Sequence, residues 1–109
     1  MNKNKFKNLQ NWDDFVIEII GESPERADHF LKTVLEEYEK DPDEAVLMTA
    51  LHQVAQAKGG FAKLAKETGL SRESLYKTLS PKGNPRFHTL KLILQALGYN
   101  IFFKHIKKA

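Results

Sequence analysis

The sequence predicts an all-α domain of short amphipathic helices, followed by a single C-terminal β-strand. Apolar residues recur at helical spacing through most of residues 12–98, and capping residues, proline or glycine bound each run. Residues 99–106 are instead rich in aromatic and branched side chains, which favour a strand. With 109 residues and 41% hydrophobic content, the chain is expected to form one domain, residues 1–109, around one modest core.

Two helices are expected before residue 40. The first follows Asn11, carries acidic residues in its first turn and ends near Gly21. The second begins after Ser23, a good N-cap residue that is followed by proline at position N1, and it continues to about Glu39. In both helices the apolar residues fall at the spacing of one buried face.

Shorter helices are expected after residue 40. Asp41-Pro42 repeats the start signal and predicts a third helix, which ends at Lys58-Gly59-Gly60. The fourth helix covers residues 61–68, and the fifth follows Ser71 as its N-cap. The last helix is expected to be capped by Asn84, with proline at position N1.

The predicted strand, residues 99–106, comes directly after Gly98, which stops the last helix. A single strand has no partner inside an otherwise helical chain, so its backbone groups would stay unpaired. The strand is therefore expected to pair with its copy in a second subunit, which would give a homodimer.

Charge divides the chain at about residue 58. Residues 1–57 carry six Lys/Arg against twelve Asp/Glu, whereas residues 58–109 carry eleven Lys/Arg against two Glu. A basic half of this size favours nucleic acid, because neutralised phosphates release condensed counterions. The acidic helices, residues 12–57, are expected to point away from DNA, and the basic core, residues 58–98, toward it. The alternative is charge that serves solubility alone.

Several classes of protein are disfavoured by composition. There is no cysteine, so disulfides and thiolate metal sites are excluded, which suits a reducing cytoplasm. The four histidines lack metal-ligand spacing, and no nucleophile-plus-base arrangement or phosphate-cradling loop is present, so neither an enzyme nor a cofactor is expected. Short apolar runs predict no membrane span, and Lys3, Lys5 and Lys7 indicate a solvated basic tail.

Residues 64–79 contain two short helical patterns separated by Thr68-Gly69-Leu70. Ala65 is small where the two helices should cross, and Gly69 can adopt the positive φ of a sharp turn. A helix that contacts DNA must present hydrogen-bonding side chains to the major groove while a preceding helix holds its inner face. The stretch therefore predicts a helix that enters the major groove.

Candidate DNA contacts lie on the polar face of this helix and on the loop after it. They are Ser71, Arg72, Glu73, Ser74, Tyr76, Lys77, Lys82, Asn84 and Arg86. Arg72 and Lys77 are expected to contact bases, and Lys82 and Arg86 to contact phosphate. Three alternatives stay open: the charges form only a solvated face, Tyr76 stacks on Arg72 or packs under the loop, and Asn84 serves only as a cap.

The order Leu64-Ala65, Gly69-Leu70-Ser71 and Leu75 resembles the helix-turn-helix of phage-repressor (Xre/Cro-like) regulators. More specifically, Ala50-Leu51, the run LAKETGLSRESLYKTLSPKGNP and TLKLILQALG resemble the addiction-module antidote family of HigA-like antitoxins over most of the chain. The resemblance implies an autorepressor that binds its own operator and is encoded beside a toxin, commonly an RNase of RelE/ParE-like fold. Phe61 stands where phage-repressor-like proteins often have a phosphate-contacting glutamine, so it is expected to lie in the core.

The acidic helices suggest a second surface, because a basic toxin would be attracted to them. If the family resemblance holds, the candidate toxin contacts are Glu36, Glu37, Glu39, Asp43 and Glu44. The alternative is that these helices only extend the core.

The functional hypothesis is a sequence-specific DNA-binding antitoxin and autorepressor of a type II toxin-antitoxin module. It would act as a homodimer on a palindromic double-stranded operator. Two rivals remain: a repressor or phage regulator without a toxin, and a toxin-neutralising interaction module in which the helix-turn-helix is only scaffold. Steep salt dependence of duplex binding would distinguish a DNA-binding protein from the scaffold.

Overall fold

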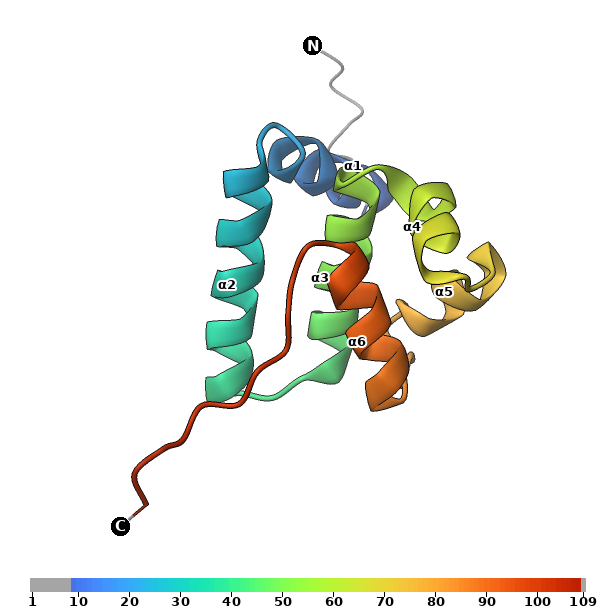
Figure 1. Cartoon of the computed structure of the whole chain (residues 1–109). Helices are drawn as coiled ribbons and strands as arrows, with labels where there is room; N and C mark the ends of the chain where they lie inside the picture. Colours follow the sequence, from blue (N-terminus) through green and yellow to red (C-terminus); the bar gives the residue numbers. More distant parts are fainter. Residues whose placement is uncertain (1–8, 109) are drawn as a thin grey trace.

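The computed structural model describes residues 9–108, which form six helices joined by short turns. The helices are α1 (Leu9–Ile20), α2 (Pro24–Lys40), α3 (Glu44–Ala57), α4 (Gly60–Thr68), α5 (Arg72–Thr78) and α6 (Phe87–Ala96). Helix α3 lies in the middle, with α2 on one side and the pair α4 and α5 on the other (Figure 1). The predicted basic tail at residues 3, 5 and 7 lies outside the described residues. None of the described helices is long and apolar enough to cross a membrane.

The core is built around α3, and residues of the other five described helices close over it. Its largest fully buried side chains are Phe61, Leu51, Leu75, Leu79, Ile93 and Val54. Complete burial of a side chain of this size stabilises the fold by about 1.5–3 kcal/mol. The short helices α4 and α5 therefore depend on contact with α3 rather than on their own helix propensity.

Two predicted helix caps are confirmed. The Ser23 Oγ accepts from the backbone N–H of Arg26 and starts α2, with proline at the first position of the helix. The Ser71 Oγ accepts from the backbone N–H of Ser74 at 3.0 Å and starts α5. Both caps satisfy a donor that the first helical turn leaves without a partner.

Three predicted helix starts are wrong by a few residues. Helix α1 begins before Asn11, so its acidic residues are not in the first turn. Helix α3 is capped by Asp43, whose Oδ1 accepts from the N–H groups of residues 45 and 46, whereas Asp41 ends α2. Helix α6 begins after Arg86 rather than at Asn84, because the preceding turn holds the chain through residue 83.

The predicted strand at residues 99–106 is absent. Gly98 has φ +98° and donates to the Gln95 carbonyl, while the Tyr99 N–H donates to the Leu94 carbonyl at 2.8 Å. These two bonds form the Schellman ending of α6, so the first residues after the helix complete its terminus. Within residues 9–108 the segment after Tyr99 has no neighbouring strand, and local β-propensity without a partner does not make one.

Tyr99 anchors the C-terminal segment to the helices. Its hydroxyl donates to the Asp28 carboxylate at 2.6 Å, and the Lys58 Nζ lies 4.7 Å from its ring centroid. The segment then runs down beside α2 and past its end (Figure 1). Partial burial, the hydrogen bond to Asp28 and the charge of Asp28 together raise the pKa of Tyr99 above the usual tyrosine range.

Tyr99→Phe is expected to lower the free energy of unfolding by about 0.5–1.5 kcal/mol at pH 8, because it removes this hydrogen bond. The raised pKa disfavours the phenolate in the folded state. The stabilisation is therefore present below the ordinary tyrosine pKa of about 10 and is lost as the pH rises above it. The phenylalanine variant lacks this loss, so urea unfolding should show a smaller difference at pH 10.5 than at pH 8.

Tyr38→Phe is the control for this comparison, because Tyr38 is also a half-buried tyrosine of the helical body. A Tyr99→Phe difference that stays constant from pH 8 to pH 10.5 would contradict the role of the phenol.

Candidate nucleic-acid interface

The turn between α4 and α5 is fixed by backbone and side-chain hydrogen bonds. Gly69 has φ +77°, as the sequence predicted, and its N–H donates to the Ala65 carbonyl at 2.9 Å. The Thr68 Oγ1 donates to the Leu64 carbonyl and accepts from the Leu70 N–H. These bonds satisfy backbone groups at the end of α4, so α5 leaves the turn in one direction.

The inner face of α5 is held by buried leucines and by aromatic contacts. Leu75 and Leu79 are buried. The Tyr76 ring stacks on Phe61 with centroids 4.2 Å apart, and His52 packs against Phe61 at 4.9 Å. The Nδ1 of His52 also lies 3.2 Å from the Leu79 carbonyl oxygen. Sequence reasoning missed the contribution of His52, because α3 and α5 are distant along the chain.

The structure shows where Phe61 and Tyr76 lie. Phe61 is 2% exposed, which confirms its place in the core. Tyr76 stacks on Phe61 rather than on Arg72. Because Tyr76 keeps 44% of its surface exposed, its ring is supported from below while one part of it faces solvent.

The outer face of α5 is polar and open to solvent. Its exposed residues, together with the cap, are Ser71, Arg72, Glu73, Ser74, Tyr76 and Lys77. The Ser71 hydroxyl is already engaged in capping the helix. No salt bridge is found for Arg72 or Lys77 within the part of the chain that the structure describes, whereas Lys63 of α4 lies 4.0 Å from Glu67. Two cations on this face are therefore left available for an external anion.

The loop after α5 carries the remaining predicted residues, Lys82, Asn84 and Arg86, and all three are exposed. The Gly83 N–H donates to the Ser80 carbonyl at 2.8 Å, and a Cβ at Gly83 would lie 1.8 Å from the Thr78 carbonyl oxygen. The backbone thus approaches α5 too closely for any other residue. This approach fixes the loop against the C-terminal end of α5. Asn84 does not cap α6.

The predicted acidic residues are all exposed, and they are divided between α2 and the start of α3. Glu36, Glu37 and Glu39 lie on α2, and Asp43 and Glu44 lie at the start of α3. Glu36 and Glu39 line a shallow hollow that Tyr99 also borders, on the flank of α2 where the C-terminal segment begins.

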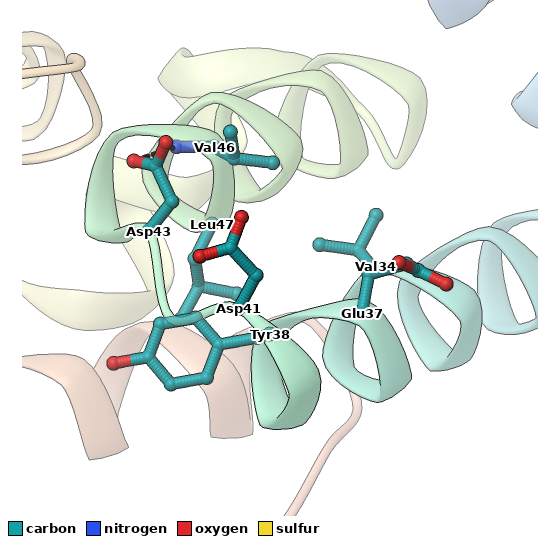
Figure 2. Close-up of a pocket in the computed structure, with 7 residues that line it drawn as sticks. All are labelled: Val34, Glu37, Tyr38, Asp41, Asp43, Val46 and Leu47. Carbon is teal, nitrogen blue, oxygen red and sulfur yellow. Dashed lines mark hydrogen bonds between the residues drawn. The ribbon is translucent and has the colours of Figure 1, made fainter.

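A second hollow lies on the other flank of α2, where its end meets the start of α3, and we call it the α2–α3 hollow (Figure 2). Its apolar residues are Val34, Tyr38, Val46 and Leu47, and its acidic residues are Glu37, Asp41 and Asp43. Its volume is about 160 Å³. No sequence pattern indicated this hollow, because it depends on how two helix ends meet.

Gly83→Ala is expected to lower the free energy of unfolding by about 2–3 kcal/mol, because the added methyl group would overlap the Thr78 carbonyl. Gly69→Ala is the matched control. Nothing lies within 4 Å of its added Cβ, so only the positive φ is strained, at a cost of about 1 kcal/mol. Urea unfolding of both variants measures the two losses, and an equal or smaller loss at Gly83 would contradict the close approach.

A family described as "Probable addiction module antidote protein" matches residues 12–105. An "Uncharacterized protein" of Haemophilus influenzae is 39% identical over 76 residues, which cover 70% of this chain and 73% of that protein. No solved structure matches this chain. The chain therefore belongs to the family of probable addiction module antidote proteins, and membership of an antidote family implies an antitoxin role with a toxin as the partner.

Proposed function

We propose that this antitoxin is a HigA-like, phage-repressor-type DNA-binding protein that represses its own operon in a type II module of the cytoplasm. The observation that carries the proposal is the outer face of α5. There a capped helix, held rigidly from below, presents Arg72 and Lys77 without a carboxylate partner among the described residues. The protein would act by binding rather than by catalysis.

In the proposed complex, α5 lies in the major groove with its N-terminal part toward the bases. Arg72 would donate to a guanine edge, and Lys77 would contact a base one turn further along the helix. Lys82 and Arg86 would contact phosphates beside the groove, because the loop that carries them is held close to α5 by Gly83. The supported ring of Tyr76 would add a contact at the groove wall.

The proposed operator is a palindrome bound by a homodimer. Two copies related by a two-fold axis would place their α5 helices in successive major grooves, about 34 Å apart. Each half-site would then be contacted by the same residues. This arrangement doubles the number of phosphate contacts and sharpens the choice of sequence.

The toxin is proposed to be a basic RNase of RelE/ParE-like fold that binds the acidic surface of α2. Helix α2 and helix α5 lie on opposite sides of α3 (Figure 1). The negative charge of Glu36, Glu37 and Glu39 would attract a cationic partner and repel DNA. Toxin and operator would therefore occupy different faces of one molecule.

Arg72→Ala is expected to weaken binding to the preferred operator by about 1–3 kcal/mol and to blur its sequence preference, because a base contact is lost. Lys82→Ala should weaken binding to all sequences alike and reduce the salt slope by about one unit, because a phosphate contact is lost. Binding-site selection, followed by titration of each variant at several salt concentrations, measures both effects.

Lys40→Ala is the matched control, since Lys40 is an exposed cation at the end of α2. It should leave operator binding unchanged. If Arg72→Ala lowers affinity equally for the operator and for random duplex, Arg72 does not contact bases. If neither Arg72→Ala nor Lys82→Ala has an effect, the DNA face lies elsewhere.

Reversal of Glu36, Glu37 and Glu39 together to lysine is expected to abolish most toxin neutralisation while the binding of α5 to a single operator half-site stays intact. Among the described residues it breaks one ion pair, between Glu37 and Lys40 at 3.8 Å, which is highly exposed and contributes little to stability. Rescue of growth in cells that express the toxin measures the first effect, and duplex titration measures the second. Neutralisation that survives this change but fails after Arg72→Ala would mean that the faces are assigned wrongly.

A further inference from the structure

The C-terminal segment leaves the protein with its apolar side chains in solvent. Phe102, Phe103 and Ile106 are 81%, 88% and 69% exposed, the highest values among the large exposed apolar residues of residues 9–108. Lysines stand at positions 104, 107 and 108, between and after them. Clustered exposed apolar side chains of this kind mark a contact surface. The segment is therefore a basic, apolar peptide held at one end by Tyr99.

The α2–α3 hollow offers the complementary chemistry. Its apolar residues Val34, Tyr38 and Leu47 surround a volume of about 160 Å³. A cavity of roughly 150 Å³ accommodates a benzene ring, so one phenylalanine side chain fits this hollow. Around the hollow stand the carboxylates of Glu37 and Asp41, both exposed, at positions that suit the lysines of an entering peptide.

The geometry indicates that the peptide comes from another molecule. The chain's own segment starts at Tyr99, beside the flank of α2 that carries Leu31 and Leu35. The hollow lies on the other flank of α2, where its end meets the start of α3. The segment then passes the end of α2 and projects away from the helices (Figure 1). Residues 102–108 span up to roughly 23 Å when extended.

We propose that the C-terminal segment of one copy docks in the α2–α3 hollow of a second copy, and that the second copy returns the same contact. A phenylalanine ring enters the hollow and the lysines lie against Glu37 and Asp41. The contact is made by side chains and needs no strand pairing. It would supply a two-fold dimer for the proposed operator, but it rests only on the segment and the hollow, so it can hold or fail independently of DNA and toxin binding.

The test is sedimentation of the full-length protein over a range of concentrations, without DNA or toxin. The wild type should form a concentration-dependent dimer. Replacement of both Phe102 and Phe103 with serine should weaken dimerisation roughly tenfold or more, because a buried aromatic anchor is lost. Phe87→Ser is the matched control, since Phe87 is an exposed phenylalanine on α6, and it should leave the dimer unchanged.

A charge exchange tests the register of the contact and does not depend on how a single variant folds. The pair Glu37→Lys with Asp41→Lys should weaken the dimer severalfold, and so should Lys104→Glu with Lys107→Glu. All four changes together should restore dimerisation. Three outcomes would overturn the proposal: a strict monomer at all concentrations, a dimer that ignores both sets of changes, or segment variants that lose toxin binding while the dimer keeps its full strength.

Discussion

The structure depends on the burial of α3. Its residues Leu51 and Val54 are almost completely shielded from solvent, and α1, α2 and α4 all pack against it. This single helix therefore separates the acidic α2 from the basic α4 and α5. Packed helices lie roughly 8–10 Å apart, so at least two such layers stand between the outer faces of α2 and α5. That distance exceeds the Debye length of about 8 Å at physiological salt, so the two faces present their charges almost independently.

The same burial explains how a helix as short as α5 can present a defined face. Seven residues do not form a stable helix in water. Here the buried Leu75 and Leu79 hold its inner side, and Phe61 supports the ring of Tyr76 by stacking. Under the proposed phage-repressor-type relationship, Phe61 stands where such proteins often have a phosphate-contacting glutamine, and here it supports Tyr76. In the proposed DNA complex, the phosphate contacts shift to the loop that Gly83 holds in place.

Local signals predicted the helices well because their caps act within a few residues. Ser23 and Ser71 each bond to a backbone group three positions ahead, so a short stretch of sequence contains the whole interaction. The start of α3 was harder to predict, because Asp41 and Asp43 stand two residues apart and either could cap a helix. The structure shows that Asp43 caps α3. The exposed face of α5 followed from the same local patterns. The α2–α3 hollow and the contact of His52 with Phe61 could not follow, since they depend on how separate helices meet.

The C-terminal segment shows why propensity alone misassigned a strand. Its aromatic and branched residues favour extended backbone, but its direction is set by contacts made elsewhere. Lys58 donates to the Leu97 carbonyl at 3.1 Å, lies 3.6 Å from Asp28 and covers the Tyr99 ring. One cation therefore joins the ends of α3 and α6 to the side of α2. The folded helices hold Tyr99 at this junction, so the segment after it runs along α2 (Figure 1). Its phenylalanines are exposed to solvent near the acidic surface of α2.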